Sequence, residues 1–320
     1  MRSIDHPKSR RNKKALARLA SGALAATLLW TCAVPFASAS EPAATVAPSS
    51  AATAFAGVTL NTTTPAMYGK LEMTFDLSTS YANPFDPEEV DAIAEIRTPS
   101  GEVERVPAFY RSDASPQWAV RYSPRQQGRH VATLRVADKN GVSSSEAYDF
   151  TAGTPEEGRG FMGVSGDRFV DSFGRQLTLL GTNYAWSSPA DITAAMPEYK
   201  DANMNLMRFW LTCWWANYSP EYGPVTTTQN GITMSYNGIG DYNLDNLERM
   251  DTVMEAAEAN GIYLMLTLNS FGDFYYDWAY HAYNRANGGP SDWKENDTDF
   301  WYNPEALRYQ ERLLRYVFAR

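Results

Sequence analysis

The residues that could bind a ligand are polar or aromatic side chains that lie toward the ends of three apolar runs or just after them: Asn183, Trp186, Arg208, Trp210, Asn269, Phe271 and Asp273. An aromatic plane can stack on the C–H face of a sugar ring, while amide, carboxylate and guanidinium groups hydrogen-bond its hydroxyl groups. In parallel α/β folds the functional loops follow the carboxyl ends of the strands. These side chains are therefore predicted to form a site for a sugar-like substrate.

Arg208 stands out among these candidates because it lies inside the apolar run Leu206–Trp210. A permanently charged guanidinium is costly there unless it is paired, and a carboxylate is its natural partner. Two interpretations stay open at this point. Arg208 belongs to a functional site, or it forms a structural ion pair.

The segment 269–302 is unusually rich in aromatic residues. Eleven of its 34 residues are Phe, Tyr or Trp, which is 32% against 13% for the whole chain. Together with nearby Asn, Asp and Arg side chains, these rings favour sugar binding. The alternative is that many of them only pack a long loop, because Tyr and Trp suit half-wet surfaces.

Other chemistries find little support in the residues. Asp241, Asn243 and Asp245 begin like a calcium-binding loop, but Asn246 stands where such a loop needs glycine, so helix capping explains the pattern better. His281 is isolated, and the sequence has no metal-ligand cluster, nucleophilic serine elbow or phosphate-binding glycine loop. We therefore expect neither a metal ion nor a cofactor.

Three predicted β-strands would position the candidate residues: Leu177–Asn183, Asn205–Leu211 and Ile262–Leu268. The last two are nearly continuous apolar runs, which is typical of parallel strands covered on both faces. A hairpin with its turn at Phe173–Arg175 is predicted just before the first. Because the strands alternate with helical segments, the sequence indicates an α/β architecture with right-handed crossovers.

The helices between these strands have recognisable ends. Ser188 is predicted to cap the first helix, and Asp245 is predicted to cap the second through a capping box with Glu248. Gly261 supplies a stop for the second helix just before the third strand. Asn303 opens a third helix that runs to the last residue.

The chain is expected to contain four segments. Residues 1–40 have a basic start, an apolar stretch and a small-residue cleavage site at Ala37–Ala39, which indicates a secretory signal. Residues 41–57 are rich in Ala, Ser, Thr and Pro, as in a flexible linker. Residues 58–153 alternate apolar and polar positions in six or seven short runs, which predicts a β-sandwich. Residues 154–320 hold the strand-helix units.

The charge distribution limits the partners. The net charge is −9, but seven of the 28 basic residues and one acid lie in the first 18 positions, so the remainder holds 21 basic and 36 acidic residues. That balance of −15 disfavours nucleic acid or an anionic membrane as a partner. Signal cleavage would leave Cys213 as the one cysteine, so the fold has to rest on its core. We expect a secreted protein, extracellular or periplasmic, without a membrane partner after cleavage.

Motifs in the second half of the chain resemble a known family. Leu180–Trp186, Asn203–Trp210 and Leu268–Phe274 are similar to the first three strands of a glycoside hydrolase family 5 type barrel, particularly its β-mannanase-like and cellulase-like members. Tyr283–Pro290 and Phe300–Glu305 are similar to the segment that follows. This resemblance implies a polysaccharide or oligosaccharide as the substrate.

The sandwich segment also resembles a module of uncharacterised role that precedes secreted bacterial glycosidase barrels, through Asn83–Asp86, Phe109-Tyr110 and Trp118–Pro124. The predicted fold class is accordingly multidomain: an all-β Ig-like sandwich followed by the first three β/α units of a (β/α)8 TIM barrel. The barrel is expected to be truncated, because roughly 160 residues are left for it where a complete barrel needs about 250.

The family resemblance implies a retaining mechanism that uses two glutamates roughly 5 Å apart. In that family one glutamate follows the fourth strand and the other follows the seventh, so both are expected beyond residue 320. Arg208 matches the family arginine that holds the nucleophile in place, and Asn269 lies near a position often occupied by histidine.

The predicted function is therefore a secreted glycoside hydrolase that acts on O-glycosidic bonds of a β-linked polysaccharide, mannan-like or glucan-like. This chain alone is expected to be inactive, and prone to aggregation through unpaired strand edges. The alternative is a noncatalytic carbohydrate-binding or cell-surface interaction protein.

Overall fold

The computed structural model describes residues 51–156, 160–184, 189–211, 219–221, 227–229, 232–234, 238–276, 278–292 and 299–320. The expected export signal, the first part of the expected linker, and the residues Trp186, Ser188 and Cys213 lie outside the described residues. No helix within the described ranges is long and apolar enough to cross a membrane.

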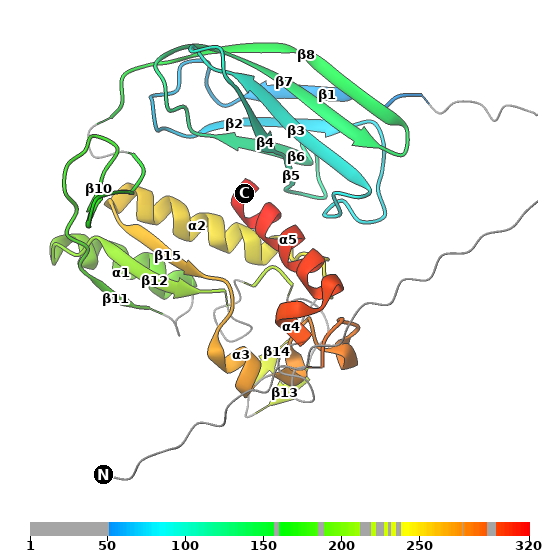
Figure 1. Ribbon diagram of the computed structural model, residues 1–320, viewed down its shortest axis with the longest axis vertical. Helices are drawn as coiled ribbons and strands as arrows, with labels where there is room; N and C mark the ends of the chain where they lie inside the picture. Colours follow the sequence, from blue (N-terminus) through cyan, green and yellow to red (C-terminus); the bar gives the residue numbers. More distant parts are fainter. Residues whose placement is uncertain are drawn as a thin grey trace, which may run out of the picture. The chain divides into compact units, whose positions relative to one another are not determined.

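The N-terminal part consists of two four-stranded sheets in which every neighbouring pair is antiparallel (Figure 1). The first sheet contains, in spatial order, β1 (Phe55–Leu60), β2 (Leu71–Leu77), β6 (Trp118–Tyr122) and β5 (Phe109–Tyr110). The second contains β4 (Val103–Pro107), β3 (Val90–Arg97), β7 (Gly128–Asp138) and β8 (Gly141–Ala152).

Alternating apolar residues build one core between these sheets. Every second side chain of β2 is buried, from Leu71 to Leu77, and the same holds for β3 from Val90 to Ile96. Successive side chains of a strand point to opposite faces, so each strand contributes one apolar row. Both rows belong to a single hydrophobic cluster that also includes Trp118 and Leu134.

The first strand begins earlier than the composition indicates. β1 starts at Phe55, inside the range 41–57 that is predicted to be linker, and Thr53 is already buried, with its hydroxyl donating to Asp138 Oδ2 at 2.6 Å. The pairing of β1 with β2 shifts register between Ala56 and Thr59, around Gly57, which has a φ of 60°. This irregularity breaks the period-two pattern by which a strand is recognised in a sequence.

The C-terminal part contains a parallel sheet of three strands: β11 (Gly181–Asn183), β12 (Leu206–Trp210) and β15 (Tyr263–Thr267). The helices α1 (Pro189–Asp201) and α2 (Leu244–Asn260) lie between these strands in sequence (Figure 1). The predicted alternation of three strands with helices is confirmed, although each strand is shorter than expected. Gly181 permits the close pairing, because a Cβ atom there would lie 1.7 Å from the Leu206 carbonyl oxygen.

The parallel sheet is covered on one face and open on the other within the described residues. Met207 and Phe209 are fully buried in a core with Met196 of α1 and Leu247 of α2. On the opposite face Met265 is 50% exposed. The prediction that both faces are covered is therefore wrong for the described part of the chain, since a continuous apolar run does not reveal which layers are present to cover it.

Helix ends follow the predicted residues in two of three described cases. Gly261 ends α2 with a φ of 69°, and Asn303 caps α5 (Pro304–Ala319), both as expected. The cap of α2 is Asn243, which accepts from the Asn246 N–H at 3.2 Å, and not Asp245. Asp245 lies in the first turn, where a negative charge favours the helix dipole without capping it.

Short elements connect these units. β9 (Gly163–Ser165) pairs with β10 (Arg168–Val170) in a hairpin that the sequence analysis did not predict. The predicted hairpin is present around its turn at Phe173–Arg175, where Val170 forms an antiparallel bridge with Gln176. The remaining short elements are β13 (Thr227–Gln229), β14 (Ile232–Met234), α3 (Phe271–Tyr275), η1 (Trp278–Tyr280), η2 (Arg285–Asn287) and α4 (Asp299–Tyr302).

Candidate substrate-binding site

Arg208 lies at the centre of a cluster formed by three neighbouring strands. Its Nε donates to Thr267 Oγ1 at 3.1 Å, and its Nη1 donates to Asn183 Oδ1 at 3.4 Å. Its guanidinium carbon lies 5.1 Å from the Trp210 ring centroid, within cation–π range. The register explains this arrangement, because Asn183 pairs with Arg208 and Trp210 pairs with Thr267 across the parallel ladders. The cluster therefore occupies the carboxyl end of the open sheet face.

The contacts of Arg208 bear on its two sequence-based interpretations. Within the described residues no carboxylate lies within 4 Å of its guanidinium, which contacts an amide, a hydroxyl and a ring. A structural ion pair is thus not what holds Arg208 among these residues. The guanidinium has five N–H donors, so it retains capacity for an incoming carboxylate or for sugar hydroxyl groups.

Thr267 is a member of this cluster that the sequence analysis did not single out. It is the last residue of β15, and its hydroxyl fixes the Nε of Arg208. A polar side chain at the end of the apolar run Leu264–Leu266 is the sequence signal that could have identified it.

Asp273 and Phe271 lie on α3, and the structure assigns them different surroundings. Asp273 is 3% exposed and completes a capping box, in which its carboxylate accepts from the Ser270 N–H at 3.0 Å while Ser270 Oγ accepts from the Asp273 N–H at 3.2 Å. Phe271 is 67% exposed. The structure thus brings Asn183, Arg208 and Trp210 together, whereas Asp273 serves a helix end.

Asn269 faces a small buried cavity that also contacts Glu221, Asp273 and His281. Burial raises the pKa of Glu221 to about 8, although the Gly240 N–H donates to its Oε1 at 3.3 Å. Burial lowers the pKa of His281 to about 3, and its Nδ1 accepts from the Tyr283 N–H at 3.2 Å. Both groups are therefore uncharged near neutral pH. Sequence analysis passed over Glu221, because nothing local marks it as buried.

The aromatic segment divides into a packed group and an exposed group. Phe274, Trp278, Tyr283 and Phe300 are buried together in one cluster, so packing accounts for these four rings. The exposed group comprises, at 50% to 75% exposure, Phe271, Tyr275, Tyr276, Trp301 and Tyr302. Within it Phe271 stacks on Tyr275 with ring centroids 5.2 Å apart. Phe271, Tyr275 and Tyr276 follow closely after β15 in the chain, whereas Trp301 and Tyr302 lie on α4.

No three His, Cys, Asp or Glu side chains in the described ranges gather closely enough to hold a metal ion. The chemistry available to the Arg208 cluster is thus hydrogen bonding, charge stabilisation and stacking.

Two family models match the chain. Residues 64–134 match a domain of unknown function, DUF5060. Residues 170–306 match Cellulase (glycosyl hydrolase family 5), and this range includes β11, β12, β15 and every member of the Arg208 cluster. Residues 170–306 therefore resemble a family 5 glycoside hydrolase, and residues 64–134 resemble a DUF5060 domain that precedes it in the chain.

Among solved structures, the chain is similar to a protein from Bacteroides vulgatus described as a putative glycoside hydrolase, with 16% identity and a TM-score of 0.54. That alignment covers 81% of this chain and 51% of the other, so the chain spans about half the length of this structure. At this identity the likeness concerns the fold alone.

Two further structures align more weakly. A family 39 glycoside hydrolase from Bacteroides cellulosilyticus shows 14% identity and a TM-score of 0.19, covering 69% of this chain and 35% of that one. CopC from Methylosinus trichosporium shows 16% identity and a TM-score of 0.22, covering 32% and 97%. Both scores are too low to support a fold assignment. No curated protein sequence matches the chain significantly.

Proposed function

We propose that the chain is part of a secreted glycoside hydrolase that cleaves O-glycosidic bonds in a β-linked polysaccharide, mannan-like or glucan-like. The observation that carries this proposal is the Arg208 cluster at the carboxyl end of a parallel sheet, inside the segment that matches family 5. Active sites of β/α barrels are built at that end of the strands.

The proposed architecture is an Ig-like sandwich followed by the first three β/α units of a TIM barrel. Two antiparallel sheets around one core support the sandwich assignment. The parallel order β11-β12-β15, with helices between the strands, supports the barrel assignment. Further strands would cover the open sheet face on which Met265 is exposed.

The proposed mechanism is retaining, with both catalytic glutamates beyond residue 320. One glutamic acid protonates the leaving glycosidic oxygen while the other attacks the anomeric carbon and forms a glycosyl-enzyme ester. Water activated by the first residue then hydrolyses the ester and returns its proton. Arg208 is a positioning residue in this scheme, because its free donors suit the nucleophilic carboxylate and its own geometry is fixed by Asn183 and Thr267.

The exposed rings of α3 are the proposed platform for the polysaccharide. Phe271 and Tyr275 stack in parallel with a 17° angle between their planes, and Tyr276 packs edge-on against Tyr275 at 4.9 Å. Sugar rings can stack on such exposed planes while polar groups near the sheet bind their hydroxyl groups.

Secretion is part of the proposal and rests on residues 1–40. Expression in a secreting host followed by N-terminal sequencing is expected to show a mature end just after Ala39. An exported product that still carried residues 1–39 would overturn this assignment.

The decisive test compares two products of the same gene, the 320-residue chain and a product that continues past codon 320. We expect the longer product to hydrolyse mannan or a β-glucan with retention of anomeric configuration, as measured by NMR, and the 320-residue chain to show no turnover. Inversion, or turnover by the 320-residue chain, would contradict the proposed mechanism. Binding without turnover by the longer product would instead favour the noncatalytic carbohydrate-binding alternative.

A further inference from the structure

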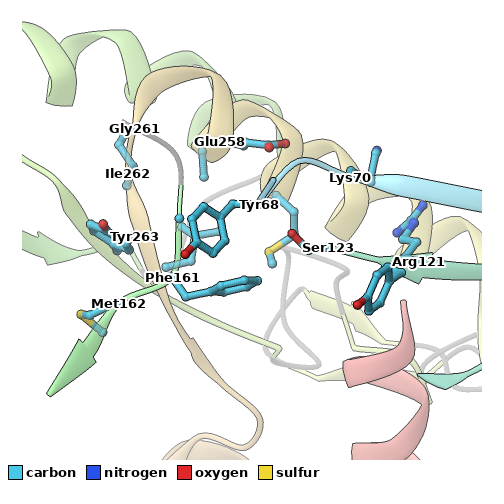
Figure 2. Close-up of a pocket in the computed structure, with 15 residues that line it drawn as sticks. Tyr68, Lys70, Arg121, Ser123, Phe161, Met162, Glu258, Gly261, Ile262 and Tyr263 are labelled. Carbon is cyan, nitrogen blue, oxygen red and sulfur yellow. The ribbon is translucent and has the colours of Figure 1, made fainter. Parts of the chain in front are cut away.

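A second cavity lies at the amino end of β15, whereas the Arg208 cluster lies at the carboxyl end of that strand. Its volume is about 550 Å³, which falls within the range of small-molecule sites in proteins. Figure 2 shows Tyr68 and Phe161 together near its centre, with Lys70 and Arg121 on one side and Tyr263 on the other. Three segments contribute to its lining: the DUF5060 part, the segment Gly160–Met162 and the connection between α2 and β15.

The walls of this cavity are fixed to one another by ion pairs. Arg121 of β6 donates to both carboxylate oxygens of Asp251 on α2 at 2.9 Å, and to Glu72 of β2 at 2.8 Å. The side chains of Arg121 and Asp251 are 19% and 17% exposed, so the pair is largely shielded from water. A cavity with walls held in this way is formed before any ligand arrives, which lowers the cost of binding.

The charged groups that line the cavity are already paired. Lys70 Nζ lies 2.8 Å from Glu255 Oε1, and Arg121 is balanced by two carboxylates. Glu258 also has a partner. Because both cations of the lining, Lys70 and Arg121, are paired with carboxylates, the cavity offers no unpaired cation to an anionic ligand, and the lining suits a neutral one.

Aromatic planes form the middle of the lining. Phe161 is 42% exposed, and its ring is held by Tyr68 edge-on at 5.9 Å and by the Arg125 guanidinium at 4.9 Å. Tyr68 has a φ of 67°, a conformation that costs a bulky residue roughly 1–3 kcal/mol and persists only where its surroundings fix it. Its N–H donates to the Pro124 carbonyl at 2.8 Å. The protein thus keeps a strained tyrosine to hold a flat ring at the cavity wall.

We propose that this cavity is a second saccharide site, in which a neutral sugar unit stacks on Phe161. Tyr263 at the cavity is the first residue of β15 and Thr267 at the Arg208 cluster is the last, so the two sites lie about 13 Å apart along the strand. The choice of a saccharide among neutral, partly apolar ligands rests on the proposed function. The cavity would hold the substrate chain, or a neighbouring one, away from the bond that is cleaved.

The test is a titration of the 320-residue chain with mannohexaose and with cellohexaose, followed by calorimetry. We expect one of them to bind, and Phe161→Leu to weaken that binding about three- to tenfold, because leucine keeps the apolar volume and removes the flat ring. Phe161→Trp is expected to retain the affinity. Failure of the unmodified chain to bind either hexasaccharide at millimolar concentration would overturn the proposal.

Phe173→Leu is the matched control. Phe173 packs edge-on against Tyr68 at 5.9 Å and is 43% exposed, as Phe161 nearly is, but it does not line the cavity. Its replacement should leave the affinity unchanged, and an equal loss in both variants would mean that the effect runs through Tyr68 and not through stacking.

Arg208→Ala separates this proposal from the proposed function. Complete loss of hexasaccharide binding in that variant would show that all binding occurs at the Arg208 cluster. This result would overturn the proposed second site and leave the proposed hydrolase function unaffected. If the longer gene product showed no turnover but its hexasaccharide binding still depended on Phe161, the proposed hydrolase function would be wrong and the second site would stand.

Discussion

At the level of single residues, Arg208 and Glu221 show how surroundings change what a charged side chain can do. Arg208 sits on an open sheet face, where an amide, a hydroxyl and an indole ring orient it. Glu221 is 5% exposed and carries a pKa raised to about 8 by burial. The first is therefore available to a ligand, whereas the second is a neutral group within the fold.

Replacement of Arg208 by lysine tests its positioning role. Lysine keeps the charge but loses the planar fork that reaches Thr267 and Asn183 together. We expect the kcat of the longer gene product on its polysaccharide to fall about 100-fold with KM little changed, since misplacement of a catalytic group acts mainly on the chemical step. The melting temperature should stay nearly constant. The milder variant Thr267→Val should reduce the kcat of the longer gene product about three- to tenfold, which corresponds to the loss of one hydrogen bond.

The buried Glu221 predicts a loss of stability at rising pH. Its pKa is raised from 4.5 to about 8, so the folded state holds a proton that the unfolded state has released between these values, and stability falls as pH rises through this window. His281 works in the opposite direction with a pKa of about 3, but its unfolded-state pKa is 6.5, so it adds less than about 0.5 kcal/mol to the stability between pH 6.5 and pH 8. Tyr242 and Tyr283, which face Glu221, have pKa values raised well above 10 and stay neutral.

Urea unfolding at pH 6.5 and pH 8 isolates the Glu221 contribution. The free energy of unfolding of the unmodified chain should drop by about 1–2 kcal/mol between these pH values. Glu221→Gln resembles the protonated acid and should reduce that drop. An unchanged pH dependence in the variant would show that Glu221 is ionised in the folded state.

At the level of elements, helix α2 connects both parts of the chain. One face contributes Leu247 and Met250 to the core under the parallel sheet, and Asp251 and Glu255 project to Arg121 and Lys70. Its ends are defined by Asn243 and by the left-handed Gly261. The position of this helix therefore matters for the sheet, for the cavity and for the DUF5060 part.

The N-cap of α2 can be located by two substitutions. Asn243→Ala should cost about 1 kcal/mol of unfolding free energy, because it removes the acceptor for the Asn246 N–H. Asp245→Ala should cost only a few tenths of a kcal/mol, since Asp245 acts through the helix dipole alone. Denaturant titration of both variants checks the order, and a larger loss at Asp245 would restore the capping box predicted from the sequence.

At the level of the whole molecule, the DUF5060 part and the family 5 part share one core. Phe85 and Phe109 of the first belong to the same cluster as Met250 of α2 and Tyr316 of α5, and Phe85 lies 5.4 Å from the Tyr316 ring. Arg312 of α5 is 6% exposed and lies 2.7 Å from Asp86. Contacts of this kind couple the two parts energetically.

This coupling predicts a single unfolding transition for residues 51–320. Asp251→Ala should lower the free energy of unfolding by about 3 kcal/mol, because it leaves the shielded Arg320 without its carboxylate and leaves Arg121 with Glu72 alone. Glu255→Ala is the matched control on the same helix, and its exposed pair with Lys70 should contribute less than about 1 kcal/mol. Calorimetry that resolved two transitions, or equal effects of both substitutions, would contradict the shared core.

Much of the local structure could be predicted from residue patterns. The apolar alternation of β2 and β3, the apolar runs of β12 and β15, and the signals at Gly261 and Asn303 depend on side chains close in sequence, and the structure confirms them. The start of β1 was not predicted, because the register shift of this strand breaks the alternating pattern. Trp186, a predicted binding residue, lies outside the described residues.

For the candidate site, the sequence predicted several of the residues but not the contacts between them. The sequence by itself determined that Asn183, Arg208 and Trp210 lie at or near the ends of successive strands, because strand ends are local features. The Ser270–Asp273 capping box is also local in sequence, and the sequence analysis missed it. Only the tertiary structure decided that Thr267 completes the cluster and that Glu221 is buried. Those outcomes depend on strand register and on which layers pack together, and such long-range contacts leave no periodic trace in the chain.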